Sequence, residues 1–202
     1  SDADREADLR YAATVYNGIR LEEFTFRTEP GRYLLSLGRI HPDKGTAEAV
    51  RIAERAGMPL LIAGIVQDER YFHEEVEPLI DGKRVRYLGH ADPAERDRLL
   101  GEALALLHPI AFEEPFGLTV VEAMACGTPV IAFARGSMPE LIRHGVTGFL
   151  TTDVEDAAEA VSRVPEIDRH NCREHVVQHF TAERMVEGYI AVYEQVLSSR
   201  RA

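Results

Sequence analysis

Short apolar runs alternate with amphipathic stretches along most of this chain. The runs predict strands at 33–38, 60–64, 85–89, 104–108, 130–133 and 149–150. The runs are mostly continuous rather than apolar at alternate positions, which is typical of parallel strands buried on both faces. Three of them end in glycine, at Gly38, Gly64 and Gly89. These glycines mark where the chain leaves the predicted sheet.

The stretches between the runs have helical periodicity. In the first, Ala49, Ile52 and Ala53 fall on one face and the charged residues fall elsewhere. Helices are predicted at 46–56, 71–80, 93–103, 118–126, 139–144, 153–163 and 181–199, the last with Thr181 as N-cap. Repeated strand–helix units predict an α/β fold, a Rossmann-like doubly wound parallel sheet of about six strands. Ligands of such sheets bind beyond the carboxyl ends of the strands.

Composition narrows the class of protein. The 202 residues are 45% apolar, enough for one α/β core and a small extension. A net charge of −11 argues against a nucleic-acid partner but allows one small anionic ligand. The acidic opening (Asp2, Asp4, Glu6 and Asp8) predicts a solvated face or frayed end. Two cysteines, no signal peptide and no run near the roughly 18 apolar residues of a membrane span favour a cytoplasmic location.

The first candidate site is the loop at 38–45, which leaves the first strand and enters a helix. Arg39 and Lys44 would both lie over the carboxyl edge of the sheet. Two cations there suit a diphosphate, because arginine can bridge two oxygens and lysine adds a point charge. From this stretch alone, an ordinary loop with exposed charges is favoured over a diphosphate site. The loop is not a Walker motif.

The second candidate is the stretch at 113–129, after the fourth strand. Glu114 precedes a turn shaped by Pro115 and Gly117, and a helix follows. The first N–H groups of a helix lack intrahelical partners, so they favour phosphate. Glu122 lies about two turns further, near the face of Leu118, where it could meet sugar hydroxyls. The alternative makes Glu122 a surface charge and Glu114 a partner of the helix dipole.

Glu114 and Glu122, with seven residues between them, resemble the motif of retaining GT-B glycosyltransferases of group 1 (family 4). Other segments resemble that family in the same order: the loop at 38–45, the strand at 85–89 and the segments at 139–142 and 145–150. The segment at 16–19 resembles the point where such chains enter their C-terminal domain. The chain is therefore similar to the C-terminal, donor-binding half of a GT-B fold.

The resemblance implies a role for each matching residue. Arg39 and Lys44 would neutralise the donor diphosphate and, with Glu114 on the transferred sugar, form the catalytic set. Backbone N–H groups at the helix start would add hydrogen bonds, and Glu122 would hold the ribose. His90 and Ala91 would face the base. The implied donor-binding residues are Arg39, Lys44, Glu114, Phe116, Gly117, Leu118, Thr119, Glu122, His90 and Ala91.

The resemblance also implies an activity and a domain plan. The activity is metal-independent, cofactor-free transfer of a hexose from a UDP- or GDP-sugar with retention of configuration. Residues 1–15 would be a tail or the remnant of an N-terminal domain, 16–180 the nucleotide-sugar domain, and 181–202 a helix packing toward the missing domain. The isolated chain would then transfer little, and any peripheral membrane association would go through the absent domain. The apolar face of the last helix (Met185, Tyr189, Val192, Val196) would be partly exposed.

Two other functions remain open at this stage: a non-catalytic nucleotide-sugar-binding module, and a nucleotide-sugar epimerase of the same fold. A dehydrogenase is disfavoured because no GxGxxG follows the first strand. His108, at a strand end, is either a wall of the cleft or a structural histidine. His175 and His179 lack the HExxH pattern of a zinc site. The sequence does not identify the base, the sugar or the acceptor.

Overall fold

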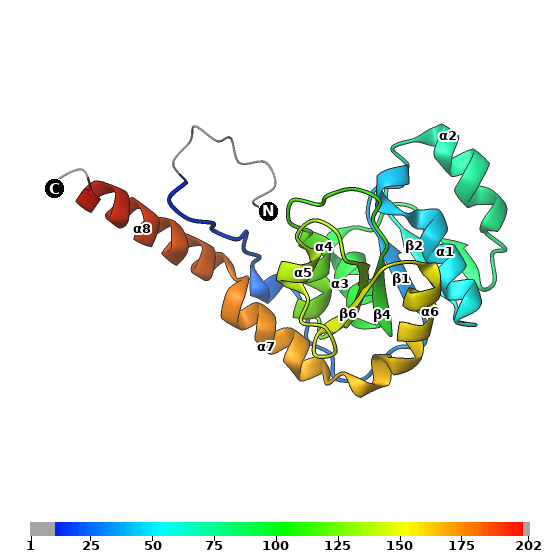
Figure 1. Cartoon of the computed structure of the whole chain (residues 1–202). Coiled ribbons are helices and arrows are strands. Elements are labelled where there is room, and N and C mark those ends of the chain that lie inside the picture. Colours follow the sequence, from blue (N-terminus) through cyan, green and yellow to red (C-terminus); the bar gives the residue numbers. More distant parts are fainter. Residues whose placement is uncertain (1–10, 200–202) are drawn as a thin grey trace.

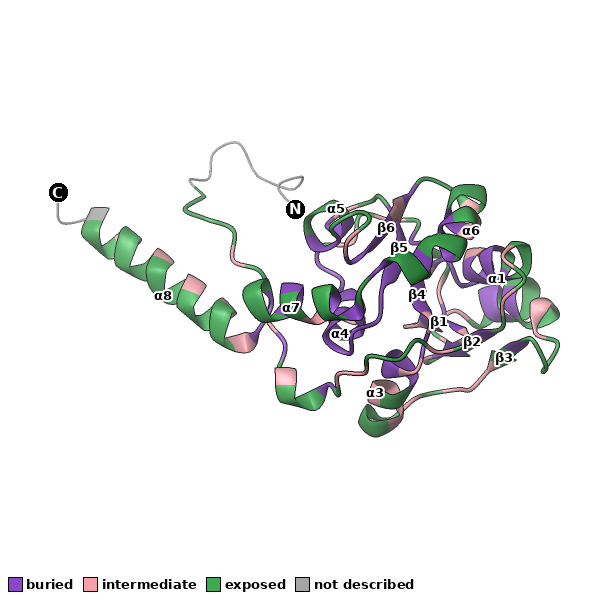
Figure 2. Ribbon diagram, turned by 90° about the horizontal axis from the view of Figure 1, so that it is seen from below, coloured by how far each residue is buried: buried purple, intermediate pink, exposed green. Residues whose placement is uncertain are grey.

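The computed structural model describes residues 11–199, so the acidic run at the start lies outside the described residues. Six strands form one parallel sheet in the order β3-β2-β1-β4-β5-β6. Figure 1 shows the whole chain, and all six strands are labelled in Figure 2. The strands are β1 (Leu34–Leu37), β2 (Leu60–Ala63), β3 (Val85–Tyr87), β4 (Ala105–His108), β5 (Val130–Phe133) and β6 (Gly148–Thr151). The predicted doubly wound, Rossmann-like sheet is confirmed.

The strand order reverses between β1 and β4, which lie side by side in the middle of the sheet. Leu34 of β1 is in register with Leu60 of β2 on one side and with Ala105 of β4 on the other. Connections leaving β1 and β4 run in opposite directions, so the loops at their carboxyl ends part and leave a crevice. Ligands of this architecture bind in that crevice.

Two layers of helices cover the sheet. On one side α1 (Thr46–Arg55) packs against α6 (Val154–Arg163); on the other, α3 (Pro93–Gly101) and α7 (Arg169–His179) both pack against α4 (Leu118–Ala125). Right-handed crossovers require this division between the two faces. The remaining helices are α2 (Glu69–Tyr71), α5 (Met138–Leu141), α8 (Ala182–Ser199), a π-helical turn (Phe72–Val76) and 3-10 turns at Leu21–Glu23, Pro42–Lys44, Glu77–Leu79 and Val164–Glu166.

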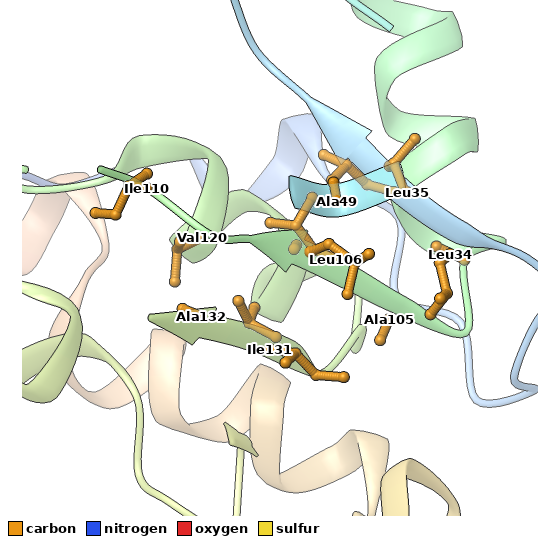
Figure 3. Close-up of a cluster of buried hydrophobic side chains, with 14 of the residues drawn as sticks. Leu34, Leu35, Ala49, Ala105, Leu106, Ile110, Val120, Ile131 and Ala132 are labelled. Atoms are coloured by element: carbon orange, nitrogen blue, oxygen red, sulfur yellow. The ribbon is translucent and has the colours of Figure 1, made fainter. Parts of the chain in front are cut away.

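The core lies between these layers. Leu34 and Leu35 of β1 and Leu106 of β4 are fully buried, and Ile131 of β5 is nearly so. Their side chains and that of Val120 of α4 cluster around the central strands (Figure 3). Burying each such side chain stabilises the fold by about 1.5–3 kcal/mol. The crevice between β1 and β4 therefore lies directly above the buried core of the central strands.

Three helices differ from the sequence-based prediction. α7 was not predicted, because its buried face includes Arg169 and His175 and so has no apolar period. The helix predicted at 71–80 begins two residues earlier, at Glu69, where Asp68 caps it, and it then changes to π and 3-10 turns. The helix predicted at 139–144 spans only Met138–Leu141.

The last helix, α8, projects away from the body (Figures 1 and 2). Thr181 Oγ1 accepts a hydrogen bond from Arg184 N–H (3.3 Å), as predicted for an N-cap. Of the apolar face predicted to be partly exposed, Tyr189 is exposed, but Met185 and Val192 are half-buried and line a groove with residues 13–16. Within residues 11–199, none of the helices is long and apolar enough to span a bilayer.

Candidate functional site

Two loops meet at the crevice, one after β1 and one after β4. Ala111 N–H donates to Asp43 O (2.8 Å), which joins them. Gly45 has a φ of 67°, and a Cβ there would overlap the carbonyl of Pro109. Only glycine fits this left-handed position without strain. The loop that carries Arg39 and Lys44 is thereby held against the loop that carries Glu114.

A cleft and a deeper cavity open between these loops. The cleft has a volume of about 320 Å³ and is lined by Leu37, Gly38, Arg39, Gly64, Ile65, His90, Ala91, Arg96, Leu118, Thr119 and Glu122. The deeper cavity, of about 30 Å³, is lined by Ser36, Leu37, Gly38, Arg39, Lys44, Thr46, Leu107, His108 and Thr119. The two adjoin, since Leu37, Gly38, Arg39 and Thr119 line both. Together they form one site at the β1/β4 crevice.

Both cations of the first loop reach this site, and both have a protein partner. Arg39 Nη1 donates to Gln67 Oε1 (2.6 Å). Lys44 Nζ forms an ion pair with Glu114 Oε2, and both side chains are largely buried. Lys44 also lies 4.7 Å from the centre of the Phe112 ring. An anion that binds Lys44 would have to share it with Glu114 or displace that carboxylate.

The start of α4 faces the same site. Gly117 is its N-cap, with a φ of 99°, and Thr119 of the first turn lines both cavities. The helix's own hydrogen bonds begin with Val120 N–H to Gly117 O (3.1 Å). The N–H groups of Leu118 and Thr119 are therefore outside that pattern, and the positive end of the helix dipole favours an anion here.

The loop before α4 is held from behind by the loop after β5. Ser137 N–H donates to Glu114 O (2.9 Å), and Ser137 Oγ donates to Phe116 O. Phe116 is buried, with its ring 6.4 Å from that of Tyr16 and 6.0 Å from that of Phe180. Phe116 and Gly117 line neither cavity, so Phe116 fixes the loop through packing. Phe116 was predicted to be a donor-binding residue, but its side chain packs against other rings and does not line the cavities.

Glu122 lies in the cleft and is almost fully buried. Arg96 Nη1 of α3 forms an ion pair with Glu122 Oε1 (3.3 Å). Burial raises the pKa of Glu122, the charge of Arg96 lowers it, and the charge of Glu23 raises it. Arg96 was missed in the sequence, where it reads as one of several charged residues on an exposed helix. Its pairing with Glu122 depends on how α3 packs on α4.

The far end of the cleft is less polar. His90 and Ala91 line it, as the sequence placed them, together with Gly64 and the exposed side chain of Ile65. Tyr87 OH donates to Gly64 O (2.8 Å) and fixes this edge. The apolar side chains of Ile65 and Ala91 at this end suit an aromatic base.

His108 was the histidine left open between a cleft wall and a structural role. It is the last residue of β4, is buried, and lines the deeper cavity. By contrast, His175 Nε2 donates to Leu141 O (3.0 Å) inside the helical layer. Among residues 11–199, no three His, Cys, Asp or Glu side chains are grouped so that they could hold a metal ion. The metal-independent chemistry implied by the resemblance stays a prediction.

The structure thus brings most of the predicted residues together. Arg39, Lys44, Leu118, Thr119, Glu122, His90 and Ala91 line the joined cavities, and Glu114 is paired with Lys44 at their edge. The two glutamates do not face open water on separate sides. Arg96 and His108 are additional residues of this site.

Comparison with known proteins gives consistent results. A family model described as glycosyl transferases group 1 matches residues 20–178. The D-inositol 3-phosphate glycosyltransferase of Mycolicibacterium smegmatis is 33% identical, over 97% of this chain and 50% of its own length. The N-acetyl-alpha-D-glucosaminyl L-malate synthase of Bacillus anthracis is 37% identical, over 56% of this chain and 31% of its own. The chain spans half or less of the length of these two relatives.

Among solved structures, Anabaena HepE in complex with UDP-glucose has a similar fold. Its TM-score is 0.74 at 23% identity, over 91% of this chain and 57% of the HepE chain. At this identity the likeness shows the fold alone.

Proposed function

Because this chain belongs to the group 1 glycosyl transferases, we propose that it binds a nucleoside diphosphate sugar and serves as the donor half of a hexosyltransferase. The observation that carries the proposal is the meeting of Arg39, Lys44 and the start of α4 around one cavity at the β1/β4 crevice. HepE, whose fold is similar, binds UDP-glucose, which supports a nucleotide sugar as ligand.

In the proposed complex the donor runs the length of the joined cavities. The base lies at His90 and Ala91, and the ribose hydroxyls donate to Glu122. Arg39 and Lys44 contact the diphosphate from one side, and the N–H groups at the start of α4 donate to it from the other. The hexose then lies beside Glu114. This assignment gives a charged partner to the charged part of the ligand and an apolar wall to the base.

The chemical task is to stabilise charge on the departing diphosphate. As the glycosidic bond breaks, the anomeric carbon becomes oxocarbenium-like and the leaving oxygen gains negative charge. Fixed donors in a cleft stabilise that charge without reorganising, and this is where Arg39, Lys44 and the α4 amides act. Glu114 positions the hexose and stabilises the positive carbon. We propose retention of configuration on the motif pair Glu114 and Glu122, with no metal required.

Transfer requires more than this chain. Its relatives are about twice as long, and the acceptor site is proposed to lie in a second domain that pairs with this one. We therefore propose that residues 1–202 bind the donor and transfer little alone. We propose that a two-domain parent protein would use a UDP-sugar or a GDP-sugar as its donor.

Titration calorimetry of the chain with UDP, GDP, ADP and their glucose or mannose conjugates tests donor binding. Wild type is expected to bind one of them, and Arg39→Ala and Glu122→Ala are expected to lose about tenfold or more in affinity. Arg70→Ala, on the exposed surface of α2, is the matched control and should bind as wild type. Unaltered binding by Arg39→Ala and Glu122→Ala would place the ligand elsewhere.

Transfer is then measured on the two-domain parent. NMR of the product during its first turnovers gives the anomeric configuration, and retention is the expected result. A parent that binds the donor but transfers to no acceptor would favour the non-catalytic module. Interconversion of sugar stereochemistry without an acceptor would favour the epimerase.

A further inference from the structure

His108 contains an unsatisfied polar atom inside the proposed donor site. Its Nε2 is buried and has no hydrogen-bond partner within the described part of the chain. The nearest charged oxygen is Glu114 Oε2, at 4.0 Å, which is beyond hydrogen-bond distance. The side chain is 8% exposed, and it lines the deeper cavity together with Arg39, Lys44 and Thr119.

A buried polar group without a partner destabilises a fold, so native cores rarely retain one. Phenylalanine would fill the volume of His108 without that penalty. The chain nevertheless has a histidine at the end of β4, where the sheet opens toward the ligand. This arrangement is expected if a ligand atom completes the hydrogen bond.

The groups around His108 indicate which kind of ligand atom would complete the hydrogen bond of Nε2. Burial and, after it, the charge of Lys44 lower the pKa of His108 to about 3, so the ring is neutral at physiological pH. A neutral imidazole has one N–H donor and no charge to repel the neighbouring Lys44. With the proton on Nε2, it offers a donor beside two cations, which together suit an anionic oxygen.

We propose that His108 is a donor-binding residue whose Nε2–H donates to the phosphate joined to the transferred hexose. This rests on the proposed function. The position follows from the two neighbours of Nε2: Lys44 is assigned to the diphosphate and Glu114 to the hexose, so Nε2 lies where these two parts of the ligand meet. His108 would then help to distinguish a nucleoside diphosphate from a monophosphate, which lacks that second phosphate.

Three substitutions separate this role from a structural one. His108→Gln keeps an amide N–H near the position of Nε2, His108→Asn keeps one only near Nδ1, and His108→Phe removes both donors. Each variant is titrated with UDP and UMP, and with GDP and GMP, and its Tm is measured without ligand. Phe and Asn are expected to weaken diphosphate binding about tenfold, while Gln stays within about threefold of wild type. Monophosphate binding is expected to change by less than about twofold in all three.

The melting temperatures give an independent readout. Because Phe removes an unsatisfied buried group, the ligand-free His108→Phe chain should melt at the wild-type temperature or above it. A lower Tm with equal losses for diphosphate and monophosphate would mean a structural role and would overturn the inference. Unchanged diphosphate binding by His108→Phe would overturn it while leaving the proposed function intact. A wild-type chain that binds no nucleoside diphosphate would overturn both.

Discussion

The ion pair between Lys44 and Glu114 sets the charge of the cleft before a ligand arrives. Both groups are largely buried, so their interaction is weakly screened by salt. A diphosphate must compete with Glu114 for Lys44 and must also approach the negative charge of Glu114. The same carboxylate that is proposed to assist transfer therefore opposes binding of the leaving group.

Glu114→Gln is accordingly expected to tighten binding of UDP or GDP by about three- to tenfold, because it frees Lys44 and removes a like charge. In the two-domain parent the same change should lower the rate of transfer. Calorimetry and initial rates measure the two effects. Glu155→Gln, an exposed carboxylate paired with Arg55, serves as the control and should alter neither. Weaker nucleotide binding in Glu114→Gln would contradict this account of the pair.

Arg96 favours the ionised form of the buried Glu122. Burial raises the pKa of Glu122, and the charge of Arg96 lowers it. In Arg96→Met the pKa of Glu122 is expected to rise further. Affinity for UDP or GDP should then fall as the pH is lowered from 8 to 5, more steeply than in wild type, because the protonated carboxyl accepts ribose hydroxyls poorly.

Arg98→Met is the matched control for this change, since Arg98 lies on the same helix and pairs only with the exposed Glu95 and Glu102. Its pH profile should follow wild type. Parallel profiles for Arg96→Met and wild type would show that Arg96 does not act through the charge of Glu122.

His108 also affects stability at acid pH. The pKa of His108 in the folded chain, about 3, lies below the ordinary histidine value of 6.5, so the unfolded chain binds more protons between these values. The stability that depends on a neutral His108 is complete above pH 6.5 and is lost as the pH falls toward 3. His108→Phe should therefore flatten the acid limb, by up to about 1.4 kcal/mol per pH unit. Denaturant unfolding at pH 7, 6, 5 and 4 measures this difference, and superimposable acid limbs would refute it.

Some residues of this site could be predicted from the sequence, and others could not. Arg39, Lys44, Glu114 and Glu122 were predictable because each lies at a fixed spacing within one continuous motif. Arg96 was not, because its role comes from the packing of α3 on α4. The same holds for the ion pair of Lys44 with Glu114, which joins two motifs far apart in sequence.

At the scale of the element, the sequence was most informative about strands. Each of the six was predicted to within two residues at either end. For the five that are largely buried, the reason is that a strand buried on both faces is a continuous apolar run; the edge strand β3, with Arg86 exposed, is the exception. α7 was missed because two of its four buried residues are Arg169 and His175. A helix whose buried face is polar gives no apolar period, and only the tertiary contacts of those side chains explain it.

Arg169 shows what holds α7 in place. Its guanidinium donates to Arg27 O, Ala103 O, Gly101 O and Thr128 Oγ1, at 2.7 to 3.0 Å. It thus joins the start of α7 to the loop before β1, the end of α3 and the loop before β5. Several backbone carbonyls depend on this one side chain.

Arg169→Met should destabilise the chain by about 3 kcal/mol, because it leaves buried carbonyls without donors. Urea unfolding measures the loss. The control is Arg70→Met on the exposed surface of α2, where the change should stay within about 0.5 kcal/mol. A loss of similar size in both variants would mean that the carbonyl contacts of Arg169 contribute little.

At the scale of the whole molecule, the charge is unevenly placed. The chain carries a net charge of −11, yet the crevice at the β1/β4 reversal holds Arg39, Lys44, Arg96 and the positive end of α4 against two carboxylates, Glu114 and Glu122. Local donors decide the binding of a small anion, and the overall negative charge acts over longer distances that salt screens. The exclusion of nucleic acid from composition and the prediction of a phosphate site from motifs are therefore compatible.

The face of α8 opposite the groove carries exposed apolar side chains, and most of the helix is exposed (Figure 2). Val186, Ile190, Tyr193 and Leu197 are each at least half exposed, and they recur at helical spacing along one side. A continuous apolar stripe of this kind favours association. The chain in dilute solution is therefore expected to self-associate through α8 as its concentration rises.

Light scattering across a dilution series measures this association. Ile190→Glu, in the middle of the stripe, should keep the chain monomeric at every concentration, because a charge there would be buried in the contact. Val177→Glu places the same charge on an exposed apolar position of α7 and should leave the association as in wild type. A wild-type chain that stays monomeric at high micromolar concentration, or equal effects of the two substitutions, would rule out α8 as the contact surface.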